Sequence, residues 1–374
     1  MRILHWAVPY YRGFGGQSIF IERLALEFIK RGHEVAILTD NHATKNIPKD
    51  NSENQLNVYS LNLSPTNLDN RTPLKFAGIV EVIQKFNPDI IHIHNLVSLE
   101  IIYLNLFLNR KGAMIPTVCT IHDLATLNRV VALLKKDEAI PRLDCIVSPS
   151  RYIDSFLRGI SLEFRKNVKI IYNGVPEKLP LEHTTFKKLH LLFAADLNEH
   201  KGAVILLSAW SKICKKYPDV TLFIAGEGAA KEFIEQYAKT SGIGQQVVFT
   251  GWLSQNELHE YLSADCVFVM PSMLGEAFGL VAAEASMAGA AVIVSRIGAL
   301  PEIVEDRVSG LVVTPGDTNS LVQAIEELIN DEELRRKFGI AAKKRAQTLF
   351  SMEKSVDEYE KTYQQLITAQ KLSN

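Results

Sequence analysis

The 374-residue sequence lacks the features of several large protein classes. It has no C-x-x-C pair and no charge-free run of about 18 apolar residues, because Glu100 interrupts the most lipid-like region, 96–108. We therefore expect neither a disulfide framework nor a membrane span. The widely spaced cysteines are Cys119, Cys145, Cys214 and Cys266. They are typical of buried free thiols in a reducing compartment, which predicts a cytoplasmic protein.

An excess of either charge is also missing. The 41 Lys and Arg residues against 42 Asp and Glu give a net charge of −1, so we expect no nucleic-acid partner. Residues 1–185 carry a net charge of +4 and the remainder −5. A basic excess this small is more often a solvated face. It still leaves room for a peripheral contact of the N-terminal half with the inner face of a membrane.

Short apolar runs alternate with segments of helical periodicity along the whole chain. The alternation is typical of β-α-β units, so the predicted fold class is α/β with parallel sheets. Two prolines and an Asn-Gly turn interrupt the pattern at residues 173–180. We predict two Rossmann-like doubly wound domains, 1–180 and 186–350, facing each other across a cleft at the carboxyl ends of their strands. A terminal helix at about 351–372 is placed to pack back onto the first domain.

Each domain has its own series of predicted strands. The first series is 3–8, 35–38, 90–93, 115–120, 145–147 and 168–171. The second is 189–195, 220–225, 247–250, 266–270, 291–294 and 311–313.

The most informative stretch of the sequence is 271–285, which follows a predicted strand and opens a helix. The backbone N–H groups near the helix start lie at the positive end of a helix dipole, where a phosphate binds well. Glu276 precedes the helix and Glu284 lies eight residues later. Carboxylates beside a phosphate accept hydrogen bonds from neutral hydroxyl groups, as in a sugar or ribose, so the stretch suggests a nucleotide sugar. Taken alone, each glutamate is equally consistent with a structural role at a helix start or on a solvated helix face.

Metal-binding patterns are weak in this sequence. No Asp-x-Asp motif for a metal-bound nucleotide sugar occurs. His92 and His94 share one face of a predicted strand and, with His122, raise the alternative of a zinc site. We do not favour it, because no carboxylate or cysteine stands at ligand spacing beside them. We expect no metal ion and no other cofactor.

The pattern Glu-x7-Glu with Phe-Gly between the glutamates resembles the retaining GT-B glycosyltransferases of family 4. Further resemblance lies, in chain order, at Gly15-Gly16, Gly32-His33, Pro88-Asp89, His122-Asp123, Ser148-Pro149-Ser150, Asn173-Gly174, Lys201-Gly202, Gly226-Glu227-Gly228, Gly251-Trp252 and Pro271-Ser272. The ordered match covers residues 1 to about 350. It implies a GT-B fold whose first domain binds the acceptor and whose second domain binds the donor.

The resemblance also implies catalytic roles for individual residues. Glu276 would bond hydroxyl groups of the transferred sugar, and Lys201 would neutralise the departing diphosphate in place of a metal ion. His122 would touch the donor sugar as a neutral imidazole. Outside this family context, Lys201 is an ordinary exposed loop lysine and His122 a polar strand end.

The expected donor-binding residues come from both domains. Glu284 would bond the ribose, and Gly15 and Gly16 would let the backbone approach the phosphate or the acceptor. The remaining donor-binding candidates are Ala277, Phe278, Gly279 and Leu280 at the diphosphate, with Gly226, Trp252 and Leu253 on neighbouring loops.

The sequence departs from the family pattern at two points. Family members usually place an arginine a few residues before the lysine, but residues 194–200 contain none, with Asp196 or Ala195 at that position and His200 as a substitute donor. The second departure is Gly298-Ala299, where Gly-Gly is common.

The leading hypothesis is a metal-independent retaining glycosyltransferase of the hexosyltransferase type. It would move a sugar from a nucleotide-diphosphate sugar to a hydroxyl of a glycan or lipid-linked acceptor, in cell-surface polysaccharide or lipopolysaccharide biosynthesis. Two alternatives stay open. One is a catalytically weak or silent GT-B subunit supporting a partner transferase, motivated by the missing arginine. The other is a phosphorylase or epimerase on the same fold.

Overall fold

The computed structural model describes residues 1–8, 10, 15–39, 56–61, 71–95, 115–123, 143–160, 167–177, 188–262 and 265–373. It divides into two compact units. Unit 1 is Met1–Gly174 with Glu353–Asn374, and unit 2 is Val175–Met352. The predicted domain break at 180–186 and the lipid-like region at 96–108 lie outside the described residues.

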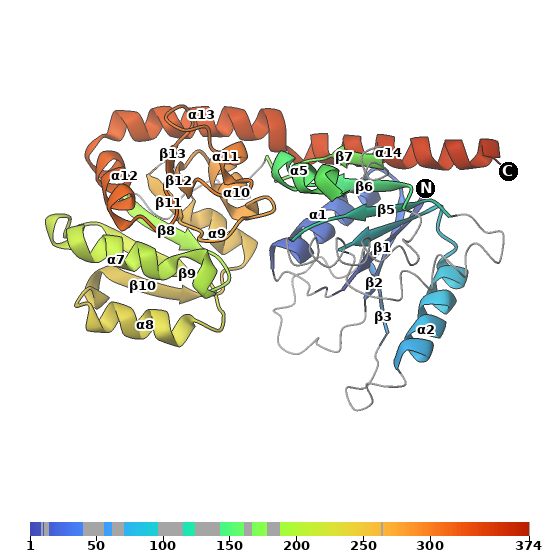
Figure 1. Cartoon of the computed structure of the whole chain (residues 1–374), viewed down its shortest axis with the longest axis horizontal. Coiled ribbons are helices and arrows are strands. Elements are labelled where there is room, and N and C mark those ends of the chain that lie inside the picture. Colours follow the sequence, from blue (N-terminus) through green and yellow to red (C-terminus); the bar gives the residue numbers. More distant parts are fainter. Residues whose placement is uncertain are drawn as a thin grey trace. The chain divides into compact units, whose positions relative to one another are not determined.

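Unit 1 is built on a seven-stranded parallel sheet in the order β3-β2-β1-β4-β5-β6-β7 (Figure 1). Its strands are β1 (Arg2–Ala7), β2 (Glu34–Thr39), β3 (Asn57–Ser60), β4 (Ile90–His94), β5 (Thr117–Thr120), β6 (Cys145–Ser148) and β7 (Val168–Ile170). Apolar runs predicted all of them except β3, because strands buried on both faces read as continuous apolar runs. The edge strand β3 was missed because its side chains are largely exposed.

Unit 2 repeats this topology in a six-stranded parallel sheet, ordered β10-β9-β8-β11-β12-β13. Its strands are β8 (His190–Ala194), β9 (Thr221–Ala225), β10 (Val247–Gly251), β11 (Cys266–Met270), β12 (Ala291–Ser295) and β13 (Leu311–Val313). All six correspond to predicted strands, and the predicted pair of parallel α/β sheets is confirmed. In both sheets the order reverses once, between β1 and β4 and between β8 and β11. Open α/β sheets bind ligands at this switch point, beside the carboxyl ends of the strands.

Helices connect the strands in both units (Figure 1). In unit 1 they include α1 (Gly16–Lys30), α2 (Arg71–Phe86) and α5 (Arg151–Ile160). In unit 2 they include η1 (Glu199–Lys201), α7 (Ala203–Ile213), η2 (Cys214–Lys216), α8 (Lys231–Thr240), η3 (Gly244–Gln246), α9 (Gln255–Tyr261), α10 (Leu280–Ala288), α11 (Leu300–Ile303), α12 (Thr318–Asn330) and α13 (Glu332–Phe350). Helix α14 (Met352–Ser373) follows.

Asp331 separates α12 from α13, because its carboxylate accepts the N–H of Leu334 at 2.8 Å and so caps α13.

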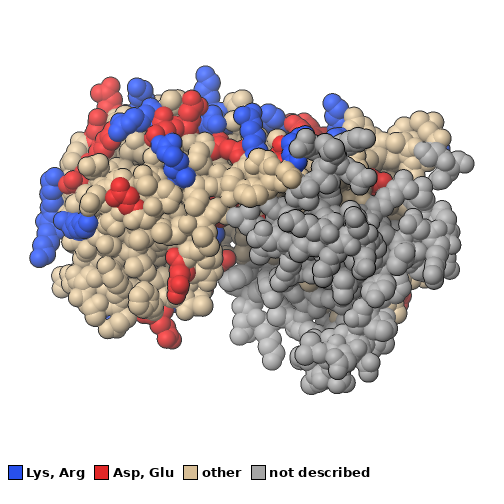
Figure 2. Space-filling model, in the orientation of Figure 1, with Lys and Arg blue, Asp and Glu red and all other residues tan. Residues whose placement is uncertain are grey.

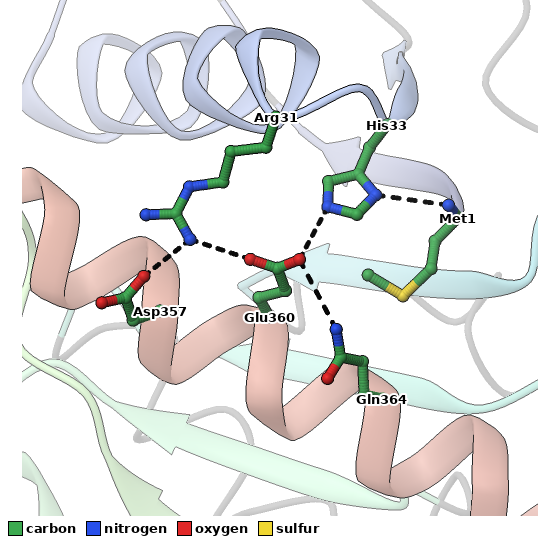
Figure 3. A network of polar contacts seen from close by, with 6 residues as sticks. All are labelled: Met1, Arg31, His33, Asp357, Glu360 and Gln364. Atoms are coloured by element: carbon green, nitrogen blue, oxygen red, sulfur yellow. Dashed lines mark hydrogen bonds and ion pairs between the residues drawn. The ribbon is translucent and has the colours of Figure 1, made fainter.

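Helix α14 is tied to the end of α1 by a polar network (Figure 3). Glu360 accepts hydrogen bonds from Arg31 Nη1 at 2.8 Å and from His33 Nε2 at 2.9 Å, and Arg31 also pairs with Asp357 at 2.6 Å. Burial favours the neutral carboxyl, but the bonds from Arg31 and His33 bring the pKa of Glu360 below its ordinary value. The terminal helix is thereby joined to unit 1, to which residues 353–374 belong.

Charged side chains of both signs mix over the described part of the face drawn in Figure 2. On α13, for example, Arg336 pairs with Glu332 one turn earlier at 2.9 Å. No helix among the described residues combines the length and the apolar character that crossing a membrane requires. All four cysteines are free and buried.

Candidate functional site

Lys201 and Glu276 form an ion pair at the switch point of unit 2. Lys201 ends η1, which follows β8, and Glu276 lies in the loop after β11. Lys201 Nζ lies 2.8 Å from Oε1 and 3.0 Å from Oε2 of Glu276, and the two side chains are 19% and 14% exposed. The hydroxyl of Ser272 donates to Oε1 of the same carboxylate at 2.9 Å. Two of the three predicted catalytic residues are thus brought together, 75 positions apart in the chain.

The backbone around Lys201 docks directly on the loop that carries Glu276. Gly202 closes η1 with a φ of +81°, and a Cβ at this position would lie 1.9 Å from the carbonyl oxygen of Pro271. The N–H of Met273 donates to the carbonyl of His200 at 2.7 Å. Only glycine allows this approach, so the position of Lys201 relative to Glu276 is set by the backbone.

The pair Gly298-Ala299 holds the backbone of Glu276 from the other side. The N–H of Ala299 donates to the carbonyl of Glu276 at 2.9 Å. Gly298 has a φ of +60°, and a Cβ there would lie 2.4 Å from the nitrogen of Glu276. Glycine at the first position of the pair is therefore required, while alanine at the second is accommodated.

The start of α10 lies directly after this loop. Gly279 is the N-cap with a φ of +104°, and no side chain caps the first turn. Ala277 and Phe278 are buried, so their contribution to an anion at this helix start would come from the backbone. Glu284 is only 2% exposed, which excludes a solvated helix face as its environment. The diphosphate contact near Leu280 and the ribose contact of Glu284 stay predictions.

The loop after β9 is hydrogen-bonded to the end of β10 at the carboxyl edge of the sheet. The N–H of Gly226 donates to the carbonyl of Gly251 at 2.8 Å. Gly226 has a φ of +136°, and a Cβ there would lie 1.9 Å from the carbonyl oxygen of Ala195. Trp252 and Leu253 directly follow β10, so they begin at the carboxyl edge that also carries η1.

The other predicted site residues belong to unit 1. Gly15 caps α1 with a φ of +80°, and no atom of the described residues lies within 4 Å of the place where its Cβ would be. Gly16 is the first residue of α1. His122 follows β5. The predicted site residues thus form two groups, one in each unit. The cleft between the domains stays a prediction.

Unit 1 also contains a histidine cluster that the sequence revealed only in part. Ligand atoms of His5, His92 and His94 lie within 4.8 Å of one another, and all three side chains are fully buried. The sequence pattern indicates His92 and His94 but not His5, whose Cα pairs with that of His92 across β1 and β4. The available signal was a polar residue inside the first apolar run.

Burial keeps these imidazoles neutral at pH 7. Burial lowers the pKa of His5 to about 3. It also lowers the pKa of His122 to about 4, although Asp123 opposes the shift. For His92 and His94, burial and then the neighbouring imidazoles hold the pKa well below its ordinary value.

The segment between β8 and Lys201 offers further candidate donors. It contains no arginine, and Asp196 and His200 are both partly exposed. The imidazole of His200 is one side chain of this segment that could donate to an anion alongside Lys201, and the amide group of Asn198 is another.

Two family models match almost consecutive parts of the chain. Residues 14–179 match the model described as Glycosyltransferase Family 4, and residues 182–345 match the one described as Glycosyl transferases group 1. The family expected from the motif resemblance is confirmed.

Two named relatives align over nearly the whole chain. The N-acetyl-alpha-D-glucosaminyl L-malate synthase of Bacillus anthracis is 27% identical, with 95% of each chain covered. The O-antigen chain mannosyltransferase C of Escherichia coli is 26% identical, covering 98% of this chain and 99% of the mannosyltransferase.

The solved structure of HepE from Anabaena in complex with UDP-glucose has a similar fold. It superposes with a TM-score of 0.78 at 20% identity, covering 98% of this chain and all of HepE. The likeness confirms the predicted GT-B fold.

Proposed function

Because the chain belongs to the group 1 glycosyl transferases of glycosyltransferase family 4, and is therefore a glycosyltransferase, we propose that its donor is a nucleotide-diphosphate sugar. In this proposal the sugar passes to a hydroxyl group of a glycan or lipid-linked acceptor, with retention of configuration and without a metal ion. The donor is held mainly by unit 2 and the acceptor mainly by unit 1.

The observation that carries the proposal is the contact of Lys201 with both carboxylate oxygens of Glu276. A donor needs positive charge at its diphosphate and hydrogen-bond acceptors at its sugar hydroxyl groups. The ion pair presents one group of each kind at the position where open α/β sheets bind ligands. Partial exposure of both side chains leaves them accessible to a ligand.

The proposed reaction exchanges one bond of the sugar for another. The bond from the sugar's anomeric carbon to the β-phosphate oxygen breaks, and a bond from that carbon to the acceptor oxygen forms on the same face. The departing phosphate oxygen takes the proton of the acceptor hydroxyl, so atoms and charge balance without a separate base. Lys201 then stabilises the negative charge that develops on the leaving diphosphate, and Glu276 holds the sugar hydroxyl groups in place.

The setting we propose is cell-surface polysaccharide or lipopolysaccharide assembly on the cytoplasmic side of the membrane. The relative from Escherichia coli, matched over almost its full length, is an O-antigen chain mannosyltransferase. The net charge of +4 over residues 1–185 is compatible with peripheral contact of unit 1 with an anionic lipid surface.

The first test is a panel of UDP-, GDP- and ADP-sugars in EDTA, scored by thermal stabilisation and by slow release of free sugar. A ligand that binds only the folded state raises the melting temperature, and at 100 times its dissociation constant it contributes about 2.7 kcal/mol. We expect one nucleotide to stabilise the protein and its sugar to be released slowly without metal.

Two lysine variants provide the matched comparison. Lys201→Met should slow sugar release by about 100-fold, the loss expected for one strong transition-state contact. Lys212→Met, which removes an exposed lysine bonded to Asn319, should leave it unchanged. Absence of stabilisation by every donor at millimolar concentration would contradict the proposed donor class and favour a subunit that acts with a partner. Release of sugar phosphate that depends on added phosphate would favour a phosphorylase.

A further inference from the structure

Three histidines of unit 1 are joined in a continuous chain of hydrogen bonds, which we call the imidazole chain: His5, His94 and His122. His5 Nδ1 lies 2.9 Å from His94 Nε2, and His94 Nδ1 lies 2.9 Å from His122 Nε2. The ring planes of His94 and His122 lie within 23° of each other, with centroids 5.2 Å apart. The chain therefore runs from the fully buried His5 on β1 to the partly exposed His122 after β5.

His122 is held at its backbone as well as at its ring. Its N–H donates to Asn95 Oδ1 at 2.7 Å. The Asn95 amide group in turn donates to Gln17 Oε1 and to Asp123 Oδ2, each at 2.8 Å. Asn95 has a φ of +68°, a conformation that asparagine tolerates better than most residues. Two consecutive residues at the end of β4 thus position His122. Asn95 binds its main chain, and His94 binds its ring.

The hydrogen-bond pattern does not fit a metal site. His94 uses both ring nitrogens in bonds to other imidazoles. His92 also uses both, one at 2.6 Å from the Tyr363 hydroxyl and the other at 2.7 Å from Thr120 Oγ1. Among the described residues, the ring nitrogen of the cluster without a partner is Nε2 of His5. A metal ion would have to break several of these bonds. The ring nitrogens are therefore used in hydrogen bonds within the protein and not as metal ligands.

A chain of neutral imidazoles has only two proton arrangements. Each neutral ring carries one N–H and one acceptor nitrogen, so His94 must donate at one end and accept at the other. In the outward arrangement, every ring is protonated on Nδ1 and donates toward His122. In the inward arrangement, every ring is protonated on Nε2 and donates toward His5.

The buried end of the chain decides between the two arrangements. The inward arrangement would put a proton on His5 Nε2, which has no acceptor among the described residues. The outward arrangement leaves only a lone pair there. Orphaned buried backbone N–H groups are rarer in proteins than under-satisfied acceptors, and we apply the same preference to the imidazole. The outward arrangement places the proton of His122 on Nδ1.

We propose that His5 and His94 are positioning residues that hold His122 in the tautomer protonated on Nδ1, so that His122 meets its ligand as a hydrogen-bond donor. The inference rests on the proposed function only for the identity of that ligand, a hydroxyl oxygen of the donor sugar. The tautomer itself is a property of the free protein.

Nitrogen NMR of the free protein tests the tautomer directly. With ¹⁵N-labelled histidine at neutral pH, long-range ¹H–¹⁵N spectra distinguish a protonated ring nitrogen from an unprotonated one, and loss of signals in His122→Asn assigns that residue. We expect a protonated Nδ1 and an unprotonated Nε2 for His122. A protonated Nε2 on His122, or zinc at one equivalent shifting the signals of His5, His92 and His94 together, would overturn the inference.

Variants on β4 separate positioning from simple packing. His94→Phe keeps an aromatic ring but removes both hydrogen bonds, so the signals of His122 should average between tautomers. His92→Phe is the matched control, because His92 is equally buried on the same strand but is not bonded to His122. In His94→Asn the side-chain amide can still donate from the position of Nδ1, and the tautomer should be restored.

Turnover gives a second readout once a donor is known. We expect a loss of about tenfold in His94→Phe, on the scale of losing an orienting partner, with recovery in His94→Asn and little change in His92→Phe. Equal losses in both phenylalanine variants would mean that the ring only fills space. If the wild type turns over no donor, the proposed function fails, whereas the NMR spectrum still decides the tautomer.

Discussion

The hydroxyl of Tyr363 lies 2.6 Å from Nδ1 of His92, although the two residues are 271 positions apart. Both side chains are fully buried, Tyr363 on α14 and His92 on β4. A residue of the terminal helix therefore completes the hydrogen bonding of an imidazole in the central part of the first sheet. The helix contributes to the polar interior of unit 1 in addition to covering it.

Replacing Tyr363 by phenylalanine should destabilise unit 1. The substitution keeps the ring but leaves His92 Nδ1 buried without its partner, which costs about 1–3 kcal/mol of unfolding free energy. Urea denaturation followed by circular dichroism measures the loss. Gln364→Ala, on an exposed position of the same helix, is the control and should change stability little. Equal stability of Tyr363→Phe and the wild type would show that the hydrogen bond contributes nothing.

Removing the carboxylate of Glu276 should cost at least about 100-fold in turnover, which corresponds to about 2.7 kcal/mol of transition-state stabilisation. In Glu276→Ala both Lys201 and Ser272 lose their shared partner, and the sugar hydroxyl groups lose an acceptor. Initial rates with the donor identified in the panel measure the effect. Near-normal turnover by a correctly folded Glu276→Ala protein would eliminate the assigned role.

Loss of Lys201 should reduce turnover by a similar factor. In Lys201→Ala the leaving diphosphate loses its positive partner. Because the proposed mechanism uses no metal ion, added magnesium should not restore the rate. The comparison is made with and without EDTA in otherwise identical assays. Rescue of Lys201→Ala by magnesium would contradict the metal-free mechanism.

The histidines of unit 1 whose pKa is lowered should make stability depend on pH in the acid range. In the unfolded chain an imidazole titrates near pH 6.5, whereas burial lowers the pKa of His5 to about 3 and of His122 to about 4. Between these values the unfolded state binds protons that the folded state does not. Unfolding free energy should therefore fall as the pH falls from about 6.5 to about 4, by up to about 1.4 kcal/mol per pH unit for each such group.

Urea denaturation from about pH 7.5 to about pH 4.5 tests this slope. His5→Phe removes one of the groups and should give a shallower dependence than the wild type. His200→Gln, which removes a partly exposed imidazole of unit 2, is the control. Parallel slopes for the wild type and His5→Phe would mean that His5 is protonated equally in the folded and unfolded states.

The sequence predicted the fold well because most strands are buried on both faces. Twelve apolar runs each correspond to a strand of the structure, and only the exposed edge strand β3 gave no signal. A parallel strand that is buried on both faces has a continuous apolar run, so it can be predicted without knowing which strands lie beside it. In β3 no residue is buried and the sequence lacks an apolar run, whereas the partly exposed edge strands β7 and β10 keep one.

The site was predicted less completely, because contacts between strands depend on the sheet order. Family resemblance indicated Lys201 and Glu276, but their ion pair follows from the pairing of β8 with β11. His5 was missed for the same reason, since its pairing with His92 follows from the contact of β1 with β4. A single histidine in an apolar run does not reveal which strand lies beside it.

Gly298 provides a test of how strictly the backbone positions Glu276. An added Cβ in Gly298→Ala would lie 2.4 Å from the nitrogen of Glu276, so the loop that carries the carboxylate must move. Gly242→Ala is a matched control, because Gly242 also has a positive φ, +71°, but its Cβ would have no atom of the described residues within 4 Å. The left-handed conformation should cost about 1–2 kcal/mol of stability in both variants, and Gly298→Ala should lose more because its Cβ collides with the backbone of Glu276. Only Gly298→Ala should also lose turnover, by about 100-fold for a displacement of about 1 Å at the reacting groups. Equal turnover in the two variants would mean that the ion pair of Lys201 and Glu276 tolerates the shift, and that positioning by Gly298 does not limit the reaction.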